Sequence, residues 1–311
     1  MDNKNVFISI IIPIYNMEKY ISKCLDSIIK IKRDDIEIVC INDGSTDNSE
    51  YICKSYQSVD NRIRLINKEN GGVASARNIG LRVASGKYIA WCDPDDYLSD
   101  DWYDSIKRLI NKDLDVILFG ANLIGFSTNR FIRYKEKSGY IKKEDFIYDI
   151  CNGRKIQSYL WSMVIKRELW DNISFPPLMS LYEDLSTLHK VVERGHSFFY
   201  LDKKIYCYLK HDKNMTNNDK KNLEEIVKND RLRMKIYKKR YNYLKRRGYN
   251  VSKISWMVPM YYFVRNYRLS EENKYEKLSH VCIRIISNNM HKIAWHKIKN
   301  LISIINGDGL K

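Results

Sequence analysis

The chain has 311 residues, of which 44% are hydrophobic and 12% aromatic, and its 54 Lys and Arg outnumber 38 Asp and Glu. This composition excludes an intrinsically disordered chain, and the length suffices for one large domain or for a domain with an appendage. The net charge of +16 indicates an anionic partner, but charge alone does not choose among a nucleotide, a phospholipid surface and nucleic acid.

Cysteine spacing and hydropathy bear on the compartment. The seven cysteines show no Cys-x-x-Cys spacing, and several lie inside apolar runs. We therefore expect buried thiols in a reducing compartment, without disulfides or a zinc cluster. No signal-peptide pattern opens the sequence, and no run approaches the ~20 apolar residues of a membrane-spanning helix. A soluble or peripheral protein on the cytoplasmic side of the membrane is expected.

The first 120 residues alternate short β-rich runs with amphipathic helical patterns. Strands are expected over 7–14, 36–41, 63–67, 88–92 and 115–119, and helices over 18–31, 47–56, 74–84 and 100–110. This alternation predicts an α/β fold with a Rossmann-like, mostly parallel sheet covered by helices on both faces. Ligands of such sheets bind beyond the carboxyl ends of the strands, so function is sought in the segments that follow each strand.

The pattern becomes less regular over 121–215. A helix is expected from the acidic pair Glu183-Asp184 to Arg194, followed by short strands over 197–201 and 205–209. From 216 to 311 the sequence is typical of helices and is rich in Lys and Tyr. We therefore divide the chain into residues 1–120, residues 121–215 of the same domain, and a basic helical region over 216–311.

An acidic cluster, Asp93-Pro94-Asp95-Asp96, follows the expected strand over 88–92. Asp93 and Asp95 are two positions apart with a proline fixing the backbone between them, so both can reach one divalent cation. A hard cation with oxygen ligands favours a diphosphate. The alternative is an ordinary turn that leads into the next helix, because Asp and Pro are common turn and cap residues.

Between the second strand and the second helix stands Asn-Asp-Gly-Ser-Thr-Asp. In a structural interpretation Gly44 permits a tight turn, and Ser45 or Asp47 caps the helix. In a functional interpretation Asp43 accepts a hydrogen bond from the imide N–H of uracil, and Tyr15 stacks on the base. Tyr15 is otherwise an ordinary interfacial tyrosine.

Together the motifs resemble the inverting family 2 glycosyltransferases with the A-type nucleotide-sugar fold, particularly bacterial members that build capsule, lipopolysaccharide or exopolysaccharide. The resemblance rests on order and spacing over some 210 residues. The matching segments are Ile11-Ile12-Pro13-Ile14-Tyr15-Asn16, Asn42-Asp43-Gly44-Ser45-Thr46-Asp47, Asn70-Gly71-Gly72 with Ala76-Arg77-Asn78-Ile79-Gly80, Asp93-Pro94-Asp95-Asp96, Tyr182-Glu183-Asp184-Leu185, and Tyr206-Cys207-Tyr208 with His211.

The resemblance implies roles for the donor-binding residues. Tyr15 and Asp43 would hold the base, with Pro13 and Ser45 in the same two motifs. A nucleotide-sugar-binding half over 1–120 and an acceptor-binding and catalytic half over 121–215 follow from this comparison.

The resemblance also implies contacts with the diphosphate. Asp93 would bind a ribose hydroxyl or the cation, and Asp95 the Mg²⁺ or Mn²⁺ that bridges the diphosphate. His211 would be a further ligand or a diphosphate contact, although a lone His beside a tyrosine is often structural. Arg77 would contact donor phosphates, unless it lies on a solvated helix face.

Asp184 is the expected catalytic residue. Inversion by direct displacement needs one carboxylate that removes the proton of the acceptor hydroxyl as this oxygen attacks the anomeric carbon. The alternative for Glu183-Asp184 is an acidic pair favoured by the dipole at a helix N-terminus.

The sequence departs from the family after Trp161. Relatives commonly have a basic residue two positions later, where this chain has Met163, with Lys166-Arg167 following. Any substrate contact of that residue is therefore in doubt here. Trp161 itself is either an apolar wall for a sugar ring or a core residue.

The expected function is transfer of a hexosyl or N-acetylhexosaminyl group from a nucleotide donor, most simply UDP-linked, to a glycan or lipid-linked oligosaccharide. The basic, aromatic region over 216–311 fits an anionic membrane surface, where roughly 1 kcal/mol per nearby Lys or Arg can accumulate. Its alternative is a solvated helical surface. A nucleotidyltransferase that makes the sugar nucleotide and a basic nucleic-acid-binding protein are the competing functions.

Overall fold

The computed structural model describes residues 6–125, 130–153, 155–177, 179, 181–211 and 223–254. The chain divides into two compact units, Met1–Met215 and Thr216–Lys311. Among the helices in these described ranges, none is long and apolar enough to cross a membrane. The six cysteines of the described part are buried, as the sequence predicted for their thiols.

The first unit is built on a ten-stranded sheet with the order β3-β2-β1-β4-β9-β6-β10-β5, while β7 pairs with β6 and β8 with β10. The strands are β1 (Ile8–Ile14), β2 (Ile36–Asp43), β3 (Ile63–Lys68), β4 (Tyr88–Trp91), β5 (Tyr97–Leu98), β6 (Val116–Ile124), β7 (Arg130–Ile132), β8 (Gly139–Ile141), β9 (Met163–Lys166) and β10 (Phe198–Leu209). The neighbouring pairs β3–β2, β2–β1 and β1–β4 are parallel, and so is the pair β6–β10. The predicted α/β fold with a mostly parallel sheet is confirmed.

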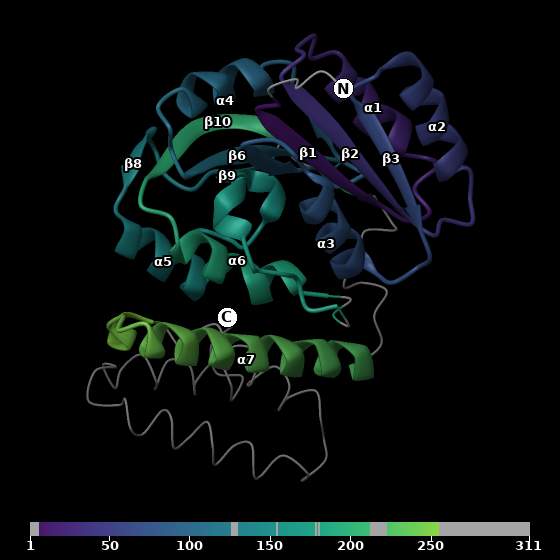
Figure 1. Cartoon of the computed structure of the whole chain (residues 1–311). Coiled ribbons are helices and arrows are strands. Elements are labelled where there is room, and N and C mark those ends of the chain that lie inside the picture. Colours follow the sequence, from purple (N-terminus) through teal and green to yellow (C-terminus); the bar gives the residue numbers. More distant parts are fainter. Residues whose placement is uncertain are drawn as a thin grey trace, which may run out of the picture. The chain divides into compact units, whose positions relative to one another are not determined.

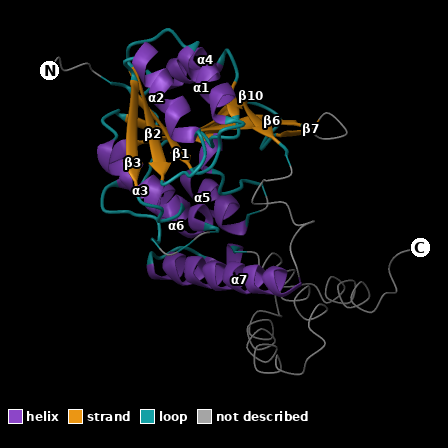
Figure 2. Ribbon diagram, turned by 90° about the vertical axis from the view of Figure 1, so that its right-hand side faces the viewer, coloured by secondary structure: helices purple, strands orange, loops and turns teal. Residues whose placement is uncertain are grey.

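Helices cover both faces of this sheet. Figures 1 and 2 show α1, α2 and α4 on one side and α3, α5 and α6 on the other. Their bounds are α1 (Ile21–Ile29), α2 (Ser49–Val59), α3 (Val73–Val83), α4 (Trp102–Ile110), α5 (Lys143–Asn152) and α6 (Glu183–Glu193). Short 3₁₀ turns lie at Leu160–Ser162 and Arg167–Trp170.

The central strand β1 explains why two helical layers are needed, because all seven of its residues are buried. Ile8, Ile10 and Ile12 belong to the core that includes apolar residues of α1 and α4. On the opposite face Ile11 meets α3 so closely that a Cβ on Gly80 would lie 2.4 Å from its Cγ2. Alternating side chains of a strand point to opposite faces, so one isoleucine run anchors both layers.

Strand β9 was not predicted, and it interrupts the parallel order. It lies between β4 and β6 and is antiparallel to both. Its four residues are all buried, so they show no alternation between polar and apolar side chains. A run this short does not reveal a strand or its direction from periodicity alone.

Strand β10 corrects another expectation, because residues 197–201 and 205–209 do not form two separate strands. They belong to the single strand Phe198–Leu209, whose register against β6 shifts between Leu201 and Lys204 and again between Lys204 and Tyr206. The polar Asp-Lys-Lys sequence breaks the apolar pattern, but the backbone pairing continues through the irregularity.

The second unit contains α7 (Leu223–Arg246) and a 3₁₀ turn at Val251–Lys253. Val227, Ile236 and Leu244 of α7 are buried, whereas Lys228 and Lys239 are exposed. This agrees with the predicted basic helical region over the described residues 223–254, whereas residues 216–222 and 255–311 of that prediction lie outside the described part of the chain.

Candidate active site

The candidate site lies beyond the carboxyl ends of β1, β2 and β4, which are adjacent and parallel. Tyr15 follows β1, Asp43 ends β2, and Asp93 comes shortly after β4. Because parallel neighbours end at the same edge of a sheet, the three segments meet there. The segments after β1, β2 and β4 are distant in sequence but lie at the same end of these strands.

The loops after β1 and β2 are joined by reciprocal hydrogen bonds. The Asn16 amide donates to Ser45 Oγ over 3.0 Å, and the Thr46 amide donates to Asn16 Oδ1 over 2.8 Å. Asn16 adopts φ 54°, a left-handed conformation that Asn tolerates better than most residues. Asp47, not Ser45, accepts an amide of the first turn of α2, from Ser49. Ser45 therefore organises the loop pair, and its contact with a donor stays a prediction.

Asp43 is almost fully buried, with 2% of its surface exposed. Its Oδ1 accepts hydrogen bonds from the Gly71 amide at 3.0 Å and from Lys68 Nζ. Gly44 has φ +70°, and a Cβ there would lie 2.7 Å from the Asn70 amide nitrogen. The close approach explains why glycine follows Asp43, and it places the Asn-Gly-Gly segment beside this carboxylate. Tyr15 is 46% exposed on the neighbouring loop.

Asp96 is buried and ties the acidic cluster to β10. It accepts hydrogen bonds from the Tyr206 hydroxyl at 2.7 Å and from the Leu209 amide at 2.8 Å. Burial, with the nearby charges of Asp93 and Asp95, raises the pKa of Asp96 to about 9. Tyr206 also accepts from the Asp93 amide over 3.1 Å. Sequence analysis assigned no task to Asp96 or Tyr206, and the structure gives both a supporting one.

Asp95 and His211 meet at the outer side of this loop. The Asp95 Oδ2 and His211 Nε2 atoms are 2.9 Å apart, and their side chains are 15% and 10% exposed. The Tyr20 ring stacks on the His211 ring with centroids 4.2 Å apart. The predicted partnership of these residues is therefore compatible with the geometry, while the bound metal stays a prediction.

The described residues contain no group of three or more His, Cys, Asp and Glu side chains that could hold a metal ion. Asp95 and His211 do offer a carboxylate oxygen and an imidazole nitrogen at one point. Mg²⁺ is usually bound by one or two carboxylates together with substrate phosphates, rather than by a complete protein cage. This donor set fits a divalent cation that arrives with a diphosphate.

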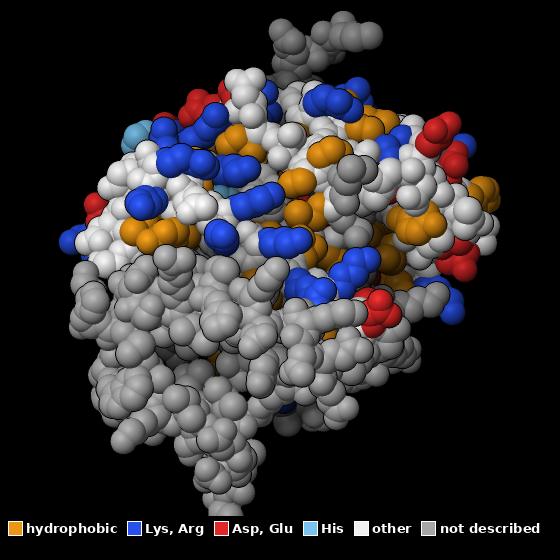
Figure 3. All heavy atoms as spheres, turned by 90° about the horizontal axis from the view of Figure 1, so that it is seen from below, with side chains coloured by type: hydrophobic (Ala, Val, Ile, Leu, Met, Phe, Trp, Pro, Cys, Tyr) orange, Lys and Arg blue, Asp and Glu red, His pale blue; other side chains and the backbone are white. Residues whose placement is uncertain are grey.

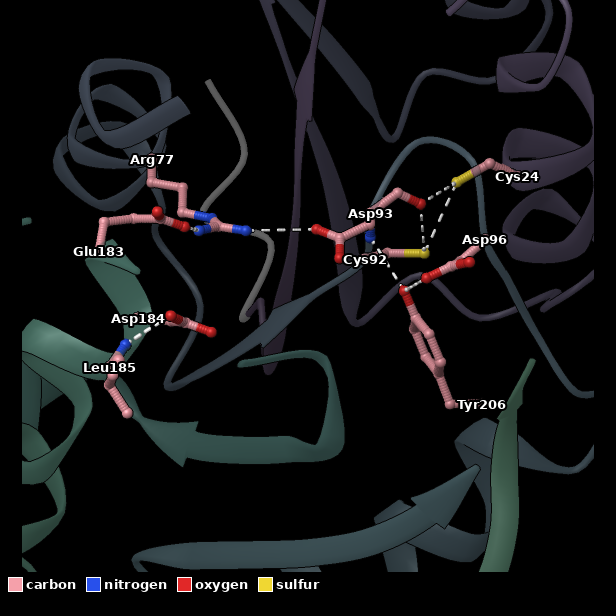
Figure 4. A network of polar contacts seen from close by, with 9 residues as sticks. All are labelled: Cys24, Arg77, Cys92, Asp93, Asp96, Glu183, Asp184, Leu185 and Tyr206. Carbon is pink, nitrogen blue, oxygen red and sulfur yellow. Dashed lines mark hydrogen bonds and ion pairs between the residues drawn. The ribbon is translucent and has the colours of Figure 1, made fainter. Parts of the chain in front are cut away.

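Arg77 joins the acidic cluster to the start of α6. Its Nη1 donates to Glu183 Oε1, and its Nη2 lies 3.3 Å from Asp93 Oδ1 (Figure 4). Burial opposes the charge of Arg77, but Glu183, Asp93 and Asp184 outweigh that effect and raise its pKa. The Asp93 pKa is raised to about 6, first by burial, although Arg77 acts in the opposite direction. The predicted contact of Arg77 with donor phosphates is not tested by these contacts.

Asp184 is half-buried in the first turn of α6, next to Glu183. Its Oδ1 accepts from the Leu185 amide. Figure 4 shows its carboxyl group on the side of α6 that faces the Asp93 loop. A carboxylate at a helix N-terminus is stabilised in its charged form, which is the form that a base requires.

Trp161 belongs to an aromatic stack and not to an open wall. Its ring stacks with the rings of Tyr159 and Tyr206, at centroid distances of 4.9 and 4.7 Å and interplanar angles of 11° and 13°. Trp161 is 6% exposed, in agreement with the core interpretation. Met163 is completely buried in β9. Lys166 pairs with Asp115 and lies beside Tyr88, the first residue of β4. It is therefore at the amino end of β4, whereas the acidic cluster follows the carboxyl end.

The fold and this edge of the sheet define a class of protein, and comparison with known families gives the same class. The model of Glycosyl transferase family 2 matches residues 9–173, more than half of the chain. The chain therefore belongs to the family 2 glycosyltransferases.

Individual proteins similar to this chain come from several organisms. Glycosyltransferase GlyA of Streptococcus pneumoniae is 33% identical over 213 residues, which are 65% of this chain but only 30% of GlyA. Staphylococcus aureus TarS 1–349, solved with UDP-GlcNAc, has a TM-score of 0.63 at 20% identity over 87% of this chain and 75% of that one. The mannosyltransferase PcManGT of Pyrobaculum calidifontis, solved with GDP-Man and Mn²⁺, has a TM-score of 0.55 at 14% identity over 90% and 80%. At these identities the two structures show the fold alone.

Proposed function

We propose that this protein transfers a single sugar, of the hexosyl or N-acetylhexosaminyl class, from a nucleoside diphosphate donor to a glycan or lipid-linked oligosaccharide in the synthesis of a bacterial cell-surface polysaccharide. The observation that carries the proposal is the convergence of the Asp43, Asp95 and Asp184 segments at one edge of the sheet. Family membership and the nucleotide-sugar complexes of TarS and PcManGT support it.

The donor nucleoside binds between the loops after β1 and β2. Both contacts of Asp43 described above reach Oδ1. Its Oδ2 then accepts the imide N–H that uracil presents, and the half-exposed Tyr15 ring packs on the base. Pro13, which lies in β1 beside Ile41 of β2, fixes the backbone that leads into this loop. A base with an imide N–H, as in UDP, fits this arrangement.

Asp95 and His211 are the residues that would hold Mn²⁺ or Mg²⁺ together with the donor diphosphate. When bound, the cation supplies positive charge that stabilises the departing nucleoside diphosphate. Asp93 lies beside this position and, through Arg77, belongs to the same charged network. Three carboxylates, Asp93, Glu183 and Asp184, lie near the one guanidinium of Arg77, and Asp95 lies near Asp93. A cation at Asp95 would offset this negative charge.

Asp184 acts as the general base. It removes the proton of the acceptor hydroxyl while that oxygen attacks the anomeric carbon from the side opposite the leaving diphosphate. A single displacement of this kind inverts the configuration at that carbon. A retaining double displacement would instead need a nucleophile that forms a covalent glycosyl intermediate.

The basic region over 216–311 brings the enzyme to an anionic membrane surface, where a lipid-linked acceptor resides. In α7 the exposed Lys228, Lys235, Lys238, Lys239 and Lys245 support this proposal. Figure 3 shows Lys and Arg side chains gathered with apolar ones between them on one face of the molecule. Deletion of 216–311 is expected to release the protein from anionic liposomes, and unchanged co-sedimentation would refute membrane attachment.

A binding and turnover experiment tests the function itself. Thermal unfolding is measured with UDP, GDP, TDP and CMP, each with and without Mn²⁺. We expect the largest stabilisation with UDP and Mn²⁺ together, because a ligand that binds only the folded state raises its stability. Transfer from the corresponding UDP-sugars is then assayed. Salt-dependent DNA binding without nucleotide-sugar turnover would instead favour the nucleic-acid alternative.

A further inference from the structure

Arg77 joins two elements that carry the proposed chemistry, and it lies within the protein. Its terminal nitrogens face Glu183 of α6 and Asp93 after β4, and only 7% of the residue is exposed. The rings of Trp91 and Phe175 each lie 5.8 Å from its Cζ. A residue that binds the donor phosphates needs N–H groups directed at the substrate. Nη1 and Nη2 of Arg77 instead contact the carboxylates of Glu183 and Asp93 (Figure 4).

Asn78, the next residue of α3, binds the backbone of Phe175, which precedes α6 in the chain. Its Nδ2 donates to the Phe175 carbonyl over 2.9 Å, and its Oδ1 accepts from the Phe175 amide over 2.8 Å. The side-chain amide of Asn78 thus pairs with both the N–H and the C=O of one residue, as the backbone of a neighbouring strand does. The backbone at Phe175 is thereby fixed to α3.

Tyr182 explains why the start of α6 needs such attachment. It adopts φ 64° and ψ 24° immediately before the helix, in the left-handed region that a bulky side chain rarely occupies. Residues in such conformations persist only when surrounding contacts determine them. Glu183, the next residue, is the one that Arg77 binds.

On the basis of the proposed transfer reaction, we propose that Arg77 and Asn78 are positioning residues that hold the first turn of α6, and with it Asp184, against the loop of Asp93 and Asp95. Neither residue touches the donor or the acceptor. Arg77 acts through Glu183 and Asp93, and Asn78 acts through the Phe175 backbone.

The test separates binding from the chemical step. Arg77→Lys keeps the charge but loses the two-pronged contact, and Asn78→Asp keeps the shape but loses the donor. We expect kcat to fall about 10- to 100-fold in both, because small displacements of a reacting group have such effects. The Kd of UDP with Mn²⁺ should stay within about twofold of wild type. Arg82→Lys, an exposed arginine of the same helix, is the matched control and should leave both constants unchanged.

A cycle with Glu183→Gln tests whether Arg77 acts through that residue. If it does, the double variant is no slower than the slower single variant, since both changes break one connection. Multiplied losses in kcat, or a tenfold or greater rise in the Kd of UDP for Arg77→Lys, would identify a direct donor contact and overturn the proposal. An unchanged kcat in Asn78→Asp would overturn the positioning role of Asn78.

Hydrogen exchange gives a readout that is independent of turnover. Amides in the first turn of α6 should exchange faster in Arg77→Lys and Asn78→Asp than in wild type, while those of α2 should be unchanged. Absence of transfer by the wild-type protein would refute the proposed function, and the exchange rates would still decide whether the two residues hold α6. Equal exchange in all proteins would refute the positioning role.

Discussion

The Asp95 Oδ2 and His211 Nε2 atoms are 2.9 Å apart, although 116 positions separate the two residues. This pair is the part of the site that can be tested through metal dependence. We expect Asp95→Asn to weaken Mn²⁺-dependent UDP binding by ~10-fold or more, because the amide is a poorer ligand for a hard cation. Calorimetry with and without Mn²⁺ measures the effect.

The exposed Asp100 provides the control for that experiment, and Asp100→Asn should bind UDP as the wild type does. Identical affinities of Asp95→Asn and wild type in the presence of Mn²⁺ would show that Asp95 does not hold the cation.

Removal of the proposed base should abolish most of the transfer and leave nucleotide binding intact. We expect Asp184→Asn to lower kcat about 10²- to 10⁴-fold, the usual contribution of general base catalysis, while the Kd of UDP changes less than about twofold. Glu168→Gln, which changes an exposed carboxylate, is the control. Full transfer by Asp184→Asn would assign the proton transfer to another group.

Asp115 and Lys166 form an ion pair whose side chains are 9% and 10% exposed, at the edge of the sheet opposite the site. Burial opposes the charge of Asp115, but Lys166 and the amides of His196 and Ser197 lower its pKa below 3.8. A lowered pKa in the folded state contributes stability above the unfolded pKa, and this contribution is lost as the pH falls through the folded value.

We therefore expect Asp115→Asn to lower the free energy of unfolding by about 1–3 kcal/mol at pH 7, and the difference from wild type to shrink as the pH falls below 3.8. Urea unfolding at several pH values measures this. Asp113→Asn, at a carboxylate whose side chain is 64% exposed, should leave the stability close to that of wild type, because exposed ion pairs contribute little. A pH-independent difference for Asp115→Asn would contradict the electrostatic explanation.

At Gly80, α3 packs closely on β1. A Cβ at this position would lie 2.4 Å from Ile11 Cγ2, so Gly80→Ala should lower the stability by about 1–3 kcal/mol despite the better helix propensity of alanine. Gly139→Ala, where the added Cβ meets nothing within 4 Å, is the control. A thermal unfolding midpoint for Gly80→Ala equal to that of wild type would show that α3 shifts without cost.

Much of the fold of residues 1–120 was predictable because its strands and helices are strongly periodic and alternate along the chain. Strand β2, which ends at Asp43, strand β4, which precedes Asp93, and the helix that begins at Glu183 were expected close to where they occur. The four-residue strand β9 and the continuity of β10 were missed, because short or interrupted apolar runs do not reveal pairing partners.

The supporting contacts of the site were less accessible to sequence analysis. Arg77 was expected at donor phosphates, and its attachment to Glu183 and Asp93 becomes visible only when α3, α6 and β4 are packed together. Tyr206 was noted only as part of a motif, and its bond to Asp96 depends on the register of β10.

The sequence by itself determined the class of fold, the family and the acidic residues offered for chemistry, because local periodicity and motif spacing are written along the chain. Only the tertiary structure decided which charges pair, that Trp161 stacks between aromatic neighbours in the core, and that Arg77 of α3 binds Glu183 at the start of α6. Those properties depend on packing between residues far apart in sequence, and neither composition nor spacing specifies which side chains meet.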